Sequence, residues 1–168
     1  MLTAQEKRVA LKAGRVGVIS DTHGLLRAEA LAALRGSELI IHAGDIGKRE
    51  VLTSLASIAP VFAIRGNIDR ETWAKKIPDI LKLRINGARF YVIHDANDLE
   101  IDPATEGFHA VISGHSHKPG LARRNGTIFL NPGSAGPRRF KLPVAMSRLT
   151  VRGQTVRAKL IELKIPSL

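Results

Sequence analysis

The sequence feature that most constrains the fold is an alternation of short apolar runs with stretches of helical periodicity. Three runs rich in Val, Ile and Phe occupy residues 16–20, 39–42 and 61–64. Apolar positions at helical spacing fill the two intervals, at 25–34 and 50–58. Short apolar runs bounded by Gly, Pro or polar residues are typical of buried strands. The alternation therefore predicts right-handed βαβ units with three parallel strands.

The second half of the chain has a different pattern. Apolar runs at 90–93 and 110–113 are again typical of buried strands. Residues 120–130 and 143–163 instead look like short strands joined by turns such as Asn125-Gly126 and Arg152-Gly153. We therefore expect an α/β fold in which the back half of the chain forms a second, more antiparallel sheet.

The length and the N-terminal segment bound the organisation of the chain. A chain of 168 residues is long enough for one hydrophobic core, so residues 14–168 are expected to form a single domain. Residues 1–13 are expected to be an N-terminal extension, either a frayed terminus or a short surface helix. This segment mixes charged and apolar residues, and no run of about 18 apolar residues occurs in the sequence. We therefore expect a cytoplasmic protein without a signal sequence or a membrane span.

Net charge and the absence of cysteine limit the substrates and metal sites that the chain can have. The formal net charge of +11 would concentrate anions near the surface, which suits phosphate-bearing substrates, although a solvated surface explains it equally well. The chain has no cysteine, which excludes disulfides, thiolate metal sites and cysteine nucleophiles. Any bound metal must therefore have nitrogen and oxygen ligands.

A potential metal ligand follows each of five expected strands. In α/β sheets, functional groups gather outside the carboxyl ends of the strands, so side chains far apart in sequence can meet in one crevice. Each segment alone is common in turns or cores, but their joint occurrence indicates a metal site. The segments are Asp21-Thr22-His23, Gly44-Asp45, Gly66-Asn67, His94 and Gly114-His115-Ser116-His117.

The spacing of these residues is compatible with a pair of metal ions. Residues two apart on an extended backbone point the same way, so Asp21 and His23 can bind one ion. His115 and His117 face the same crevice, where they can bind one ion or two ions about 3.5 to 4 Å apart. Two ions need a bridging carboxylate. Asp45 is the best candidate because the glycine before it lets the backbone bend sharply, and glycines before Asn67 and His115 repeat this device.

The expected ligands suit transition metals. Four imidazoles, two carboxylates and one amide oxygen are too rich in nitrogen for calcium; Mn(II) is favoured, with Zn, Fe or Ni as alternatives. Two such ions can polarise phosphoryl oxygens and lower the pKa of a bridging water, so that metal-bound hydroxide attacks phosphorus. No side-chain nucleophile is then needed, and Asp45, Asn67 and His94 would take part in catalysis through the metals. The seven expected ligands are Asp21, His23, Asp45, Asn67, His94, His115 and His117.

Five motifs resemble those of the calcineurin-like metallophosphoesterases, in particular the small single-domain phosphodiesterases of bacteria and archaea. The resemblance extends from about residue 16 to residue 163. It implies a four-layer αββα sandwich, in which two mixed sheets pack together with helices outside, and a metal-dependent phosphodiesterase activity. The motifs are Ser20-Asp21-Thr22-His23-Gly24, His42-Ala43-Gly44-Asp45, Arg65-Gly66-Asn67, Gly114-His115-Ser116-His117 and Asn131-Pro132-Gly133-Ser134.

The same resemblance divides the ligands between two ions that share one carboxylate. All of the family's ligand positions are filled in this chain. The resemblance places Asp21, His23, Asp45 and His117 on the first ion, and Asp45, Asn67, His94 and His115 on the second.

The chain departs from the family pattern at Ile68. Relatives often have a histidine or a cysteine there, and the histidine protonates the leaving group. Asp69 follows, but a carboxylate beside two cations should have a lowered pKa and would be a poor acid at neutral pH. A metal-bound water would then supply the proton. Such an enzyme should favour aryl esters, which have good leaving groups, over alkyl esters.

A second departure follows His94. The family commonly continues with glycine and another histidine, whereas this chain has Asp95 and Ala96. Carboxylates often orient metal-bound imidazoles, so Asp95 could partly compensate, and an ordinary surface or capping role is equally compatible with the sequence.

Other residues near the motifs have weaker claims to a role. Arg65, Arg138 and Arg139 could bind phosphate with their planar guanidinium groups, but surface arginines are abundant in this chain. His42 is expected to be an ordinary strand-end residue. The motif that begins at Asn131 is expected to be a structural turn beside the site.

Three functions compete with phosphodiester hydrolysis. A phosphomonoesterase would use the same site, and a nuclease would exploit the positive charge. A non-catalytic metal-binding scaffold is the third, because one eukaryotic relative, a retromer subunit, resembles this branch in fold and works by binding partners. The expected partner is a small phosphoester substrate. A nucleic acid is a less favoured partner, no membrane is expected, and a homo-oligomer is compatible with the sequence.

Overall fold

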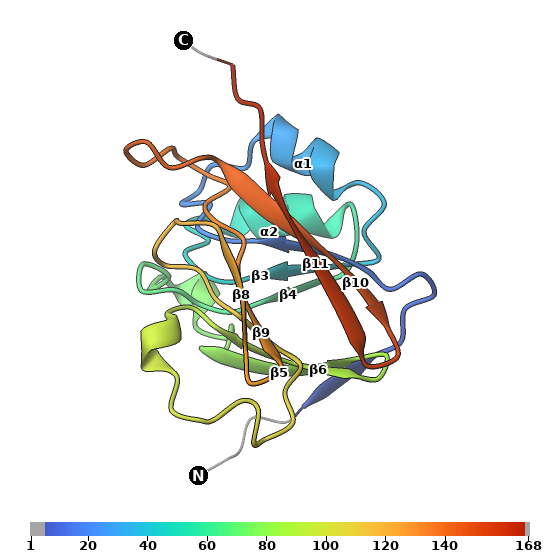
Figure 1. The fold of residues 1–168 in the computed structure, drawn as a ribbon. Coiled ribbons are helices and arrows are strands. Elements are labelled where there is room, and N and C mark those ends of the chain that lie inside the picture. Colours follow the sequence, from blue (N-terminus) through green and yellow to red (C-terminus); the bar gives the residue numbers. More distant parts are fainter. Residues whose placement is uncertain (1–5, 167–168) are drawn as a thin grey trace.

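Two β-sheets pack face to face, and two α-helices cover the outside of one of them (Figure 1). The structure, a computed structural model, describes residues 6–166. The first sheet has five strands in the order β11-β10-β2-β3-β4. They are β2 (Arg15–Ile19), β3 (Leu39–His42), β4 (Val61–Ala63), β10 (Ala145–Arg152) and β11 (Thr155–Glu162).

The second sheet has six strands in the order β1-β5-β6-β7-β9-β8. It is mixed, because β1 pairs with β5 in parallel and β6, β7 and β9 are parallel to one another, whereas β5–β6 and β8–β9 are antiparallel. Its strands are β1 (Lys7–Val9), β5 (Ile80–Ile85), β6 (Ala88–Ile93), β7 (Ala110–Ile112), β8 (Gly120–Arg124) and β9 (Thr127–Asn131).

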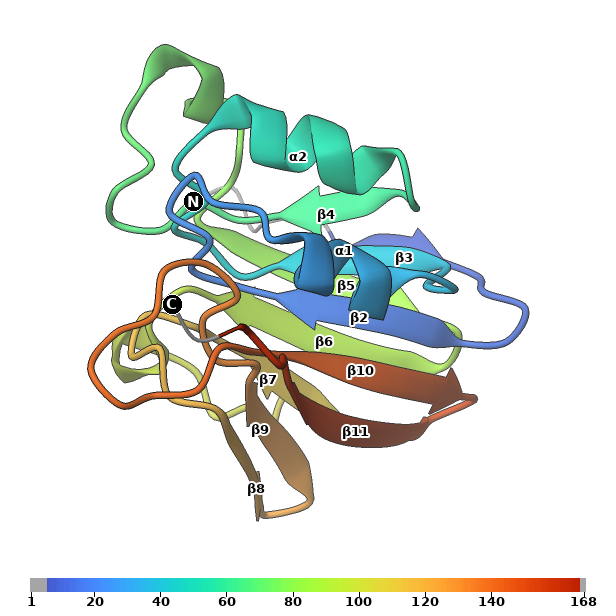
Figure 2. The ribbon, with the colours of Figure 1, turned by 90° about the horizontal axis from the view of Figure 1, so that it is seen from above.

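The helices follow the predicted βαβ pattern. α1 (Ala28–Leu34) connects β2 to β3, and α2 (Arg49–Ala56) connects β3 to β4, with the three strands parallel. Each helix buries residues four apart, which lie on one helical face: Ala30 with Leu34, and Val51 with Leu55. Figure 2 shows both helices over β2, β3 and β4, while β10 and β11 extend beyond α1. Two short 3-10 helices are η1 (Thr72–Ala74) and η2 (Ala96–Asp98).

The main core lies between the two sheets, where inward-facing Val, Ile and Leu side chains pack around the fully buried Phe90. A second apolar cluster fills the space between the five-stranded sheet and the helices. A smaller cluster with Tyr91 and Phe108 covers the outer face of the six-stranded sheet. The predicted fold class, two mixed sheets packed together with helices outside, is confirmed. On the six-stranded sheet the outer layer is thin, since η2 and its neighbouring segment form it.

Two strands were not predicted. β5 alternates buried Leu81 and Leu83 with outward-facing Lys82 and Arg84, so it lacks the continuous apolar run of a strand buried on both faces. β1 lies at residues 7–9 and pairs with β5. The predicted frayed terminus or helix is therefore wrong for this part of residues 1–13, while residues 1–5 lie outside the described part of the chain.

The two C-terminal hairpins join different sheets. β8 and β9, which flank Asn125-Gly126, extend the six-stranded sheet, whereas β10 and β11 extend the five-stranded sheet beside β2. The predicted second sheet is present, but the prediction is wrong for residues 143–163, because β10 and β11 join the five-stranded sheet and β1 from the N-terminal segment joins the second sheet. No helix within residues 6–166 is long and apolar enough to cross a membrane.

Candidate metal centre

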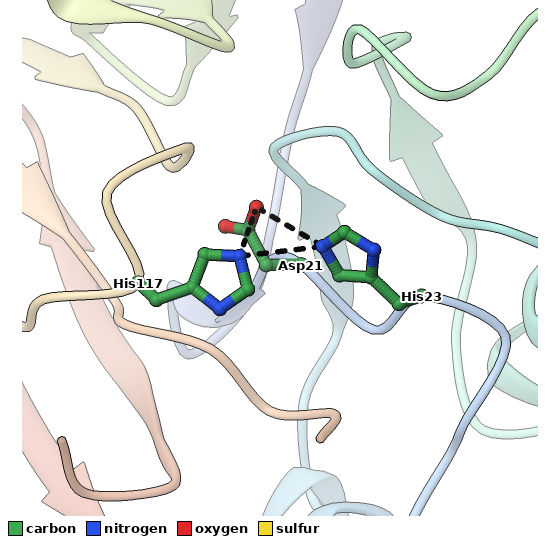
Figure 3. A group of neighbouring side chains, drawn as sticks. All are labelled: Asp21, His23 and His117. Atoms are coloured by element: carbon green, nitrogen blue, oxygen red, sulfur yellow. Dashed lines mark hydrogen bonds and ion pairs between the residues drawn. The ribbon is translucent and has the colours of Figure 1, made fainter. Parts of the chain in front are cut away.

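Three predicted ligands meet at the carboxyl ends of β2 and β7. Asp21 and His23 follow β2, and His117 lies in the loop after β7. His117 Nε2 lies 3.4 Å from Asp21 Oδ1 and 3.3 Å from His23 Nε2. Figure 3 shows Asp21 and His23, from the loop after β2, converging with His117 from the loop after β7. Their nitrogen and oxygen atoms can together hold one divalent cation.

A second group combines Asp45 after β3, His94 after β6 and His115 after β7. One donor atom from each lies within 4.8 Å of the others. Asn67 joins this group, because its Oδ1 atom lies 3.2 Å from His115 Nδ1. The structure thus brings the seven predicted residues into two adjoining groups. Their role as metal ligands stays a prediction.

Asp45 lies between the two groups. Its Oδ2 atom is 3.5 Å from His23 Nε2 in the first group and 3.3 Å from His94 Nε2 in the second. Its Oδ1 atom accepts a hydrogen bond from the Ile68 N–H at 3.2 Å. This is the position that a bridging carboxylate needs.

Unpartnered buried atoms also fit a cation site. Within residues 6–166, Asp21 Oδ1, His94 Nε2 and His117 Nδ1 are buried side-chain atoms without a hydrogen-bond partner. Such atoms are rare in folded proteins because an unsatisfied buried polar group costs free energy. His94 Nδ1 donates to the Ala43 carbonyl oxygen at 2.7 Å, so in the neutral ring Nε2 carries the lone pair. A cation in the crevice would satisfy both this nitrogen and Asp21 Oδ1.

Left-handed backbone conformations are concentrated at the ligands. Non-glycine residues adopt positive φ values rarely, and each instance costs on the order of 1 kcal/mol or more. The extended backbone that was assumed for the Asp21 and His23 pair is therefore wrong, and loop conformation aims these side chains instead. The five ligands with φ between 46° and 71° are Asp21, His23, Asp45, His115 and His117.

Three glycines precede ligands, for two different reasons. Gly44 has φ +99°, which agrees with the predicted sharp bend. A Cβ atom on Gly66 would collide with the Asp45 carboxylate, and a Cβ atom on Gly114 would lie 2.6 Å from Asp21 Oδ2. Gly66 and Gly114 therefore act by leaving room for a ligand rather than by bending the chain.

The environment sets the charge of each group. Burial, followed by the positive charge of Arg139, lowers the pKa of His117 to about 4, so its imidazole is neutral at physiological pH. Burial also disfavours charged His94, but its hydrogen bonds and the nearby carboxylates outweigh this effect and raise its pKa. Burial raises the pKa of Asp21. For Asp45, burial is outweighed by hydrogen bonds and by His94, so the pKa is lowered and the carboxylate is ionised.

Asp69, which the sequence places near the candidate cation sites, holds two loops together. Its buried carboxylate accepts hydrogen bonds from the backbone N–H groups of Ile46, Gly47 and Gly66 at 2.9 to 3.0 Å. These bonds connect the loop that carries Asp45 to the loop that carries Asn67. The expectation that Asp69 is not the acid stays a prediction.

His42 has a larger structural role than the prediction gave it. Its Nε2 atom lies 2.9 Å from Thr22 Oγ1, and its Nδ1 atom accepts a hydrogen bond from the Gly44 N–H. Thr22 Oγ1 in turn donates to the Ile46 carbonyl. Burial lowers the pKa of His42 to about 3, which keeps the ring neutral. In the sequence, this role is indicated by the position of His42 at the start of the His-Ala-Gly-Asp motif.

The turn that begins at Asn131 supports both histidines of the Gly-His-Ser-His loop. Asn131 Nδ2 donates to the Gly114 carbonyl oxygen at 2.9 Å and to Ser116 Oγ at 3.1 Å. Ser134 Oγ donates to the Asp21 carbonyl oxygen at 2.9 Å. These contacts agree with the structural role expected of this motif.

A hollow of about 400 Å³ adjoins the second ligand group. Arg65 lines it and makes a bidentate ion pair with Asp79, at 3.0 and 3.1 Å. Asp95 also lines it: Oδ1 accepts a hydrogen bond from the Asn97 N–H, and Oδ2 lies 3.6 Å from His115 Nε2. Asp95 therefore has the capping role, and an orienting role toward His115 stays a prediction.

Comparisons with known proteins agree with this geometry. The family model of the calcineurin-like phosphoesterase superfamily domain matches residues 15–154. The chain belongs to this superfamily. Its members are metal-dependent, and the chain is accordingly a hydrolase that acts on phosphoric ester bonds.

Relatives cover about nine-tenths of this chain. A probable metallophosphoesterase of Methanothermobacter thermautotrophicus is 34% identical over 162 residues, which cover 90% of this chain and 94% of that protein. The structure of an archaeal phosphodiesterase has a TM-score of 0.74 at 22% identity, covering 88% and 99% of the two chains. Zinc-bound Vps29 of Entamoeba histolytica has a TM-score of 0.71 at 19% identity, covering 88% and 98%. At these identities, both structures show the fold.

Proposed function

We propose that this protein is a phosphodiesterase with a dinuclear metal centre. The main support for this proposal is the position of Asp45, whose Oδ2 atom lies within 3.5 Å of a histidine nitrogen from each ligand group. In this proposal the two ions share Asp45. Asp21, His23, Asp45 and His117 would hold the first ion, and Asp45, Asn67, His94 and His115 would hold the second.

Side chains around the crevice support a reaction without a protein nucleophile. When bound, two divalent ions supply hydroxide at neutral pH and stabilise negative charge on the phosphoryl oxygens. The neighbouring hydroxyl groups are committed elsewhere: Ser20 Oγ donates to Asp21 Oδ2, and Thr22 Oγ1 to the Ile46 carbonyl. Asp45, Asn67 and His94 would therefore contribute by holding and orienting the ions.

The choice of metal and substrate follows the donor set. Imidazole, carboxylate and amide donors favour Mn(II), with Zn, Fe or Ni as alternatives. Ile68 offers no proton, so esters with good leaving groups are the favoured substrates. A small phosphoester substrate and a cytoplasmic location complete the proposal.

Hydrolysis of bis-nitrophenyl phosphate tests this function. The protein is stripped of metal, Mn(II) is added back, and bound metal is counted for the wild type and for Asp45→Ala. We expect about two ions per wild-type chain and a loss of about a hundredfold or more in Asp45→Ala, because even residues that only support ligands contribute tenfold to a hundredfold. Glu50→Ala, which removes an exposed carboxylate on α2, is the control and should stay active.

Two other results of this experiment would favour a different function. Hydrolysis of nitrophenyl monophosphate but not of the diester would favour the phosphomonoesterase. A wild type that binds two ions yet hydrolyses neither ester would favour the scaffold function.

A further inference from the structure

Charge is unevenly distributed along the chain. From Gly107 to the C-terminus there are eleven Lys and Arg side chains but a single acidic one, Glu162. The segment from Asp69 to Glu106 instead carries eight acidic side chains, and several of them line the hollow beside the metal centre. The excess positive charge therefore belongs to the β8–β11 half of the molecule and not to the surroundings of the second ligand group.

The fold gathers part of this charge on one surface, which we call the basic face. Along β10 and β11, buried Leu149, Val151 and Val156 point into the core between the sheets, so the alternate residues point outward. The helices cover β2 to β4 and leave this outer surface open (Figure 2). The basic face consists of Arg15 on β2, Arg35 after α1, Arg148 and Arg152 on β10, and Arg157 and Lys159 on β11.

The basic face is hollowed in two adjoining places that share Thr150. Arg15, Arg35 and Arg148 line one hollow of about 330 Å³. Arg152 and Arg157 line the other, of about 440 Å³, together with Thr150 and Thr155. Guanidinium forks and hydroxyl groups are the donors that recur at phosphate contacts.

The cations of the basic face lack acidic partners. Among residues 6–166, none of the six side-chain cations forms an ion pair, although the Glu38 carboxylate accepts a hydrogen bond from the backbone N–H of Arg15; the arginines that form ion pairs are Arg65, Arg84 and Arg89. Arg148 and Lys159 are directly opposite each other on neighbouring strands. Like charges in this position destabilise a sheet. Arg148 is held by its own chain, because its guanidinium donates to the Ala33 carbonyl oxygen at 2.6 and 3.2 Å. An anionic partner would offset the remaining repulsion between Arg148 and Lys159.

We propose that the basic face binds the phosphate backbone of a nucleic acid. Five of its six cations are arginines, whose planar groups pair with phosphate bidentately. A membrane surface fits less well, because the large exposed apolar side chains lie on other elements: Leu25, Ile68, Leu121 and Phe140. Arg15 begins β2, and the β10–β11 turn lies at that same end, whereas the ligands follow the far end of β2. The binding is thus independent of the proposed hydrolysis.

Binding of a fluorescein-labelled single-stranded 20-mer, followed by anisotropy between about 50 and 200 mM NaCl, tests this inference. The test variant is Arg152→Gln/Arg157→Gln/Lys159→Gln, whose exposed side chains make no hydrogen bond or ion pair within residues 6–166. The matched control, Arg8→Gln/Lys75→Gln/Lys76→Gln, removes the same charge from exposed positions elsewhere. Each lost phosphate contact reduces the slope of log K against log salt by about 0.7.

We therefore expect the test variant to reduce the slope by about two and the affinity at the lowest salt by about tenfold or more, with the control close to wild type. Equal losses in both variants would overturn the proposal, since only net charge would then matter. Absence of wild-type binding at 50 mM NaCl would also overturn it. So would charge-dependent binding to phosphatidylserine vesicles without oligonucleotide binding. Hydrolysis of bis-nitrophenyl phosphate should be unchanged in both variants, which separates this test from that of the proposed function.

Discussion

Ile68 lies beside the bridging carboxylate with its backbone N–H on Asp45 and its side chain 41% exposed. No proton donor is supplied at this position, so placing one there should extend the range of leaving groups. We expect Ile68→His to raise kcat/KM for alkyl phosphodiesters by about a hundredfold, the lower end of general acid catalysis, with little effect on nitrophenyl esters. Steady-state kinetics on both ester classes would show this. Ile68→Asn, which is polar but cannot act as the acid, should give no such gain.

Arg139 contributes a positive charge near the first ligand group, where it lowers the pKa of His117. Its side chain is exposed and can meet an arriving phosphate. We expect Arg139→Gln to raise KM for bis-nitrophenyl phosphate several-fold while kcat changes little. A fall in kcat at unchanged KM would instead place Arg139 in transition-state stabilisation.

At the scale of elements, Asp69 connects the loops after β3 and β4. Removing its carboxylate in Asp69→Ala leaves three backbone N–H groups unsatisfied, each costing about 1 to 3 kcal/mol if it stays buried. We expect a loss of about 3 kcal/mol or more in the free energy of unfolding, measured by urea denaturation, together with weaker metal binding. Asp79→Ala removes an aspartate whose side chain is 72% exposed and should cost about 1 kcal/mol or less.

The strands that carry the ligands could be predicted because they are apolar on both faces, and a continuous apolar run is visible without tertiary information. β5 could not be found in this way, since Lys82 and Arg84 interrupt its apolar residues. The directions in which the ligand side chains point could not be predicted from the sequence pattern either. Asp21 and His23 meet through left-handed loop conformations, and periodicity carries no information about those.

At the scale of the whole molecule, buried neutral histidines make stability depend on pH. Burial lowers the pKa of His42 to about 3 and that of His117 to about 4. The unfolded chain, with histidine pKa values near 6.5, therefore binds more protons than the folded chain below that pH. The buried Asp21 carboxyl, with its raised pKa, acts in the opposite direction.

We expect the metal-free protein to lose stability as the pH falls from about 6.5 toward 4, by up to about 1.4 kcal/mol per pH unit for each of the two histidines. Urea denaturation at a series of pH values measures this slope. His42→Gln should show a shallower dependence over the same range. An identical slope in the variant would mean that the pKa of His42 does not differ between the folded and unfolded states.

The left-handed backbone at the ligands has a consequence for how such a chain changes over generations. His115 has φ 71° and a side chain that is 45% exposed, so without metal it contributes strain and little packing. We expect His115→Gly to stabilise the metal-free protein by about 1 kcal/mol, as thermal denaturation would show, while abolishing activity. Any lineage released from selection for hydrolysis would thus gain stability by discarding ligands.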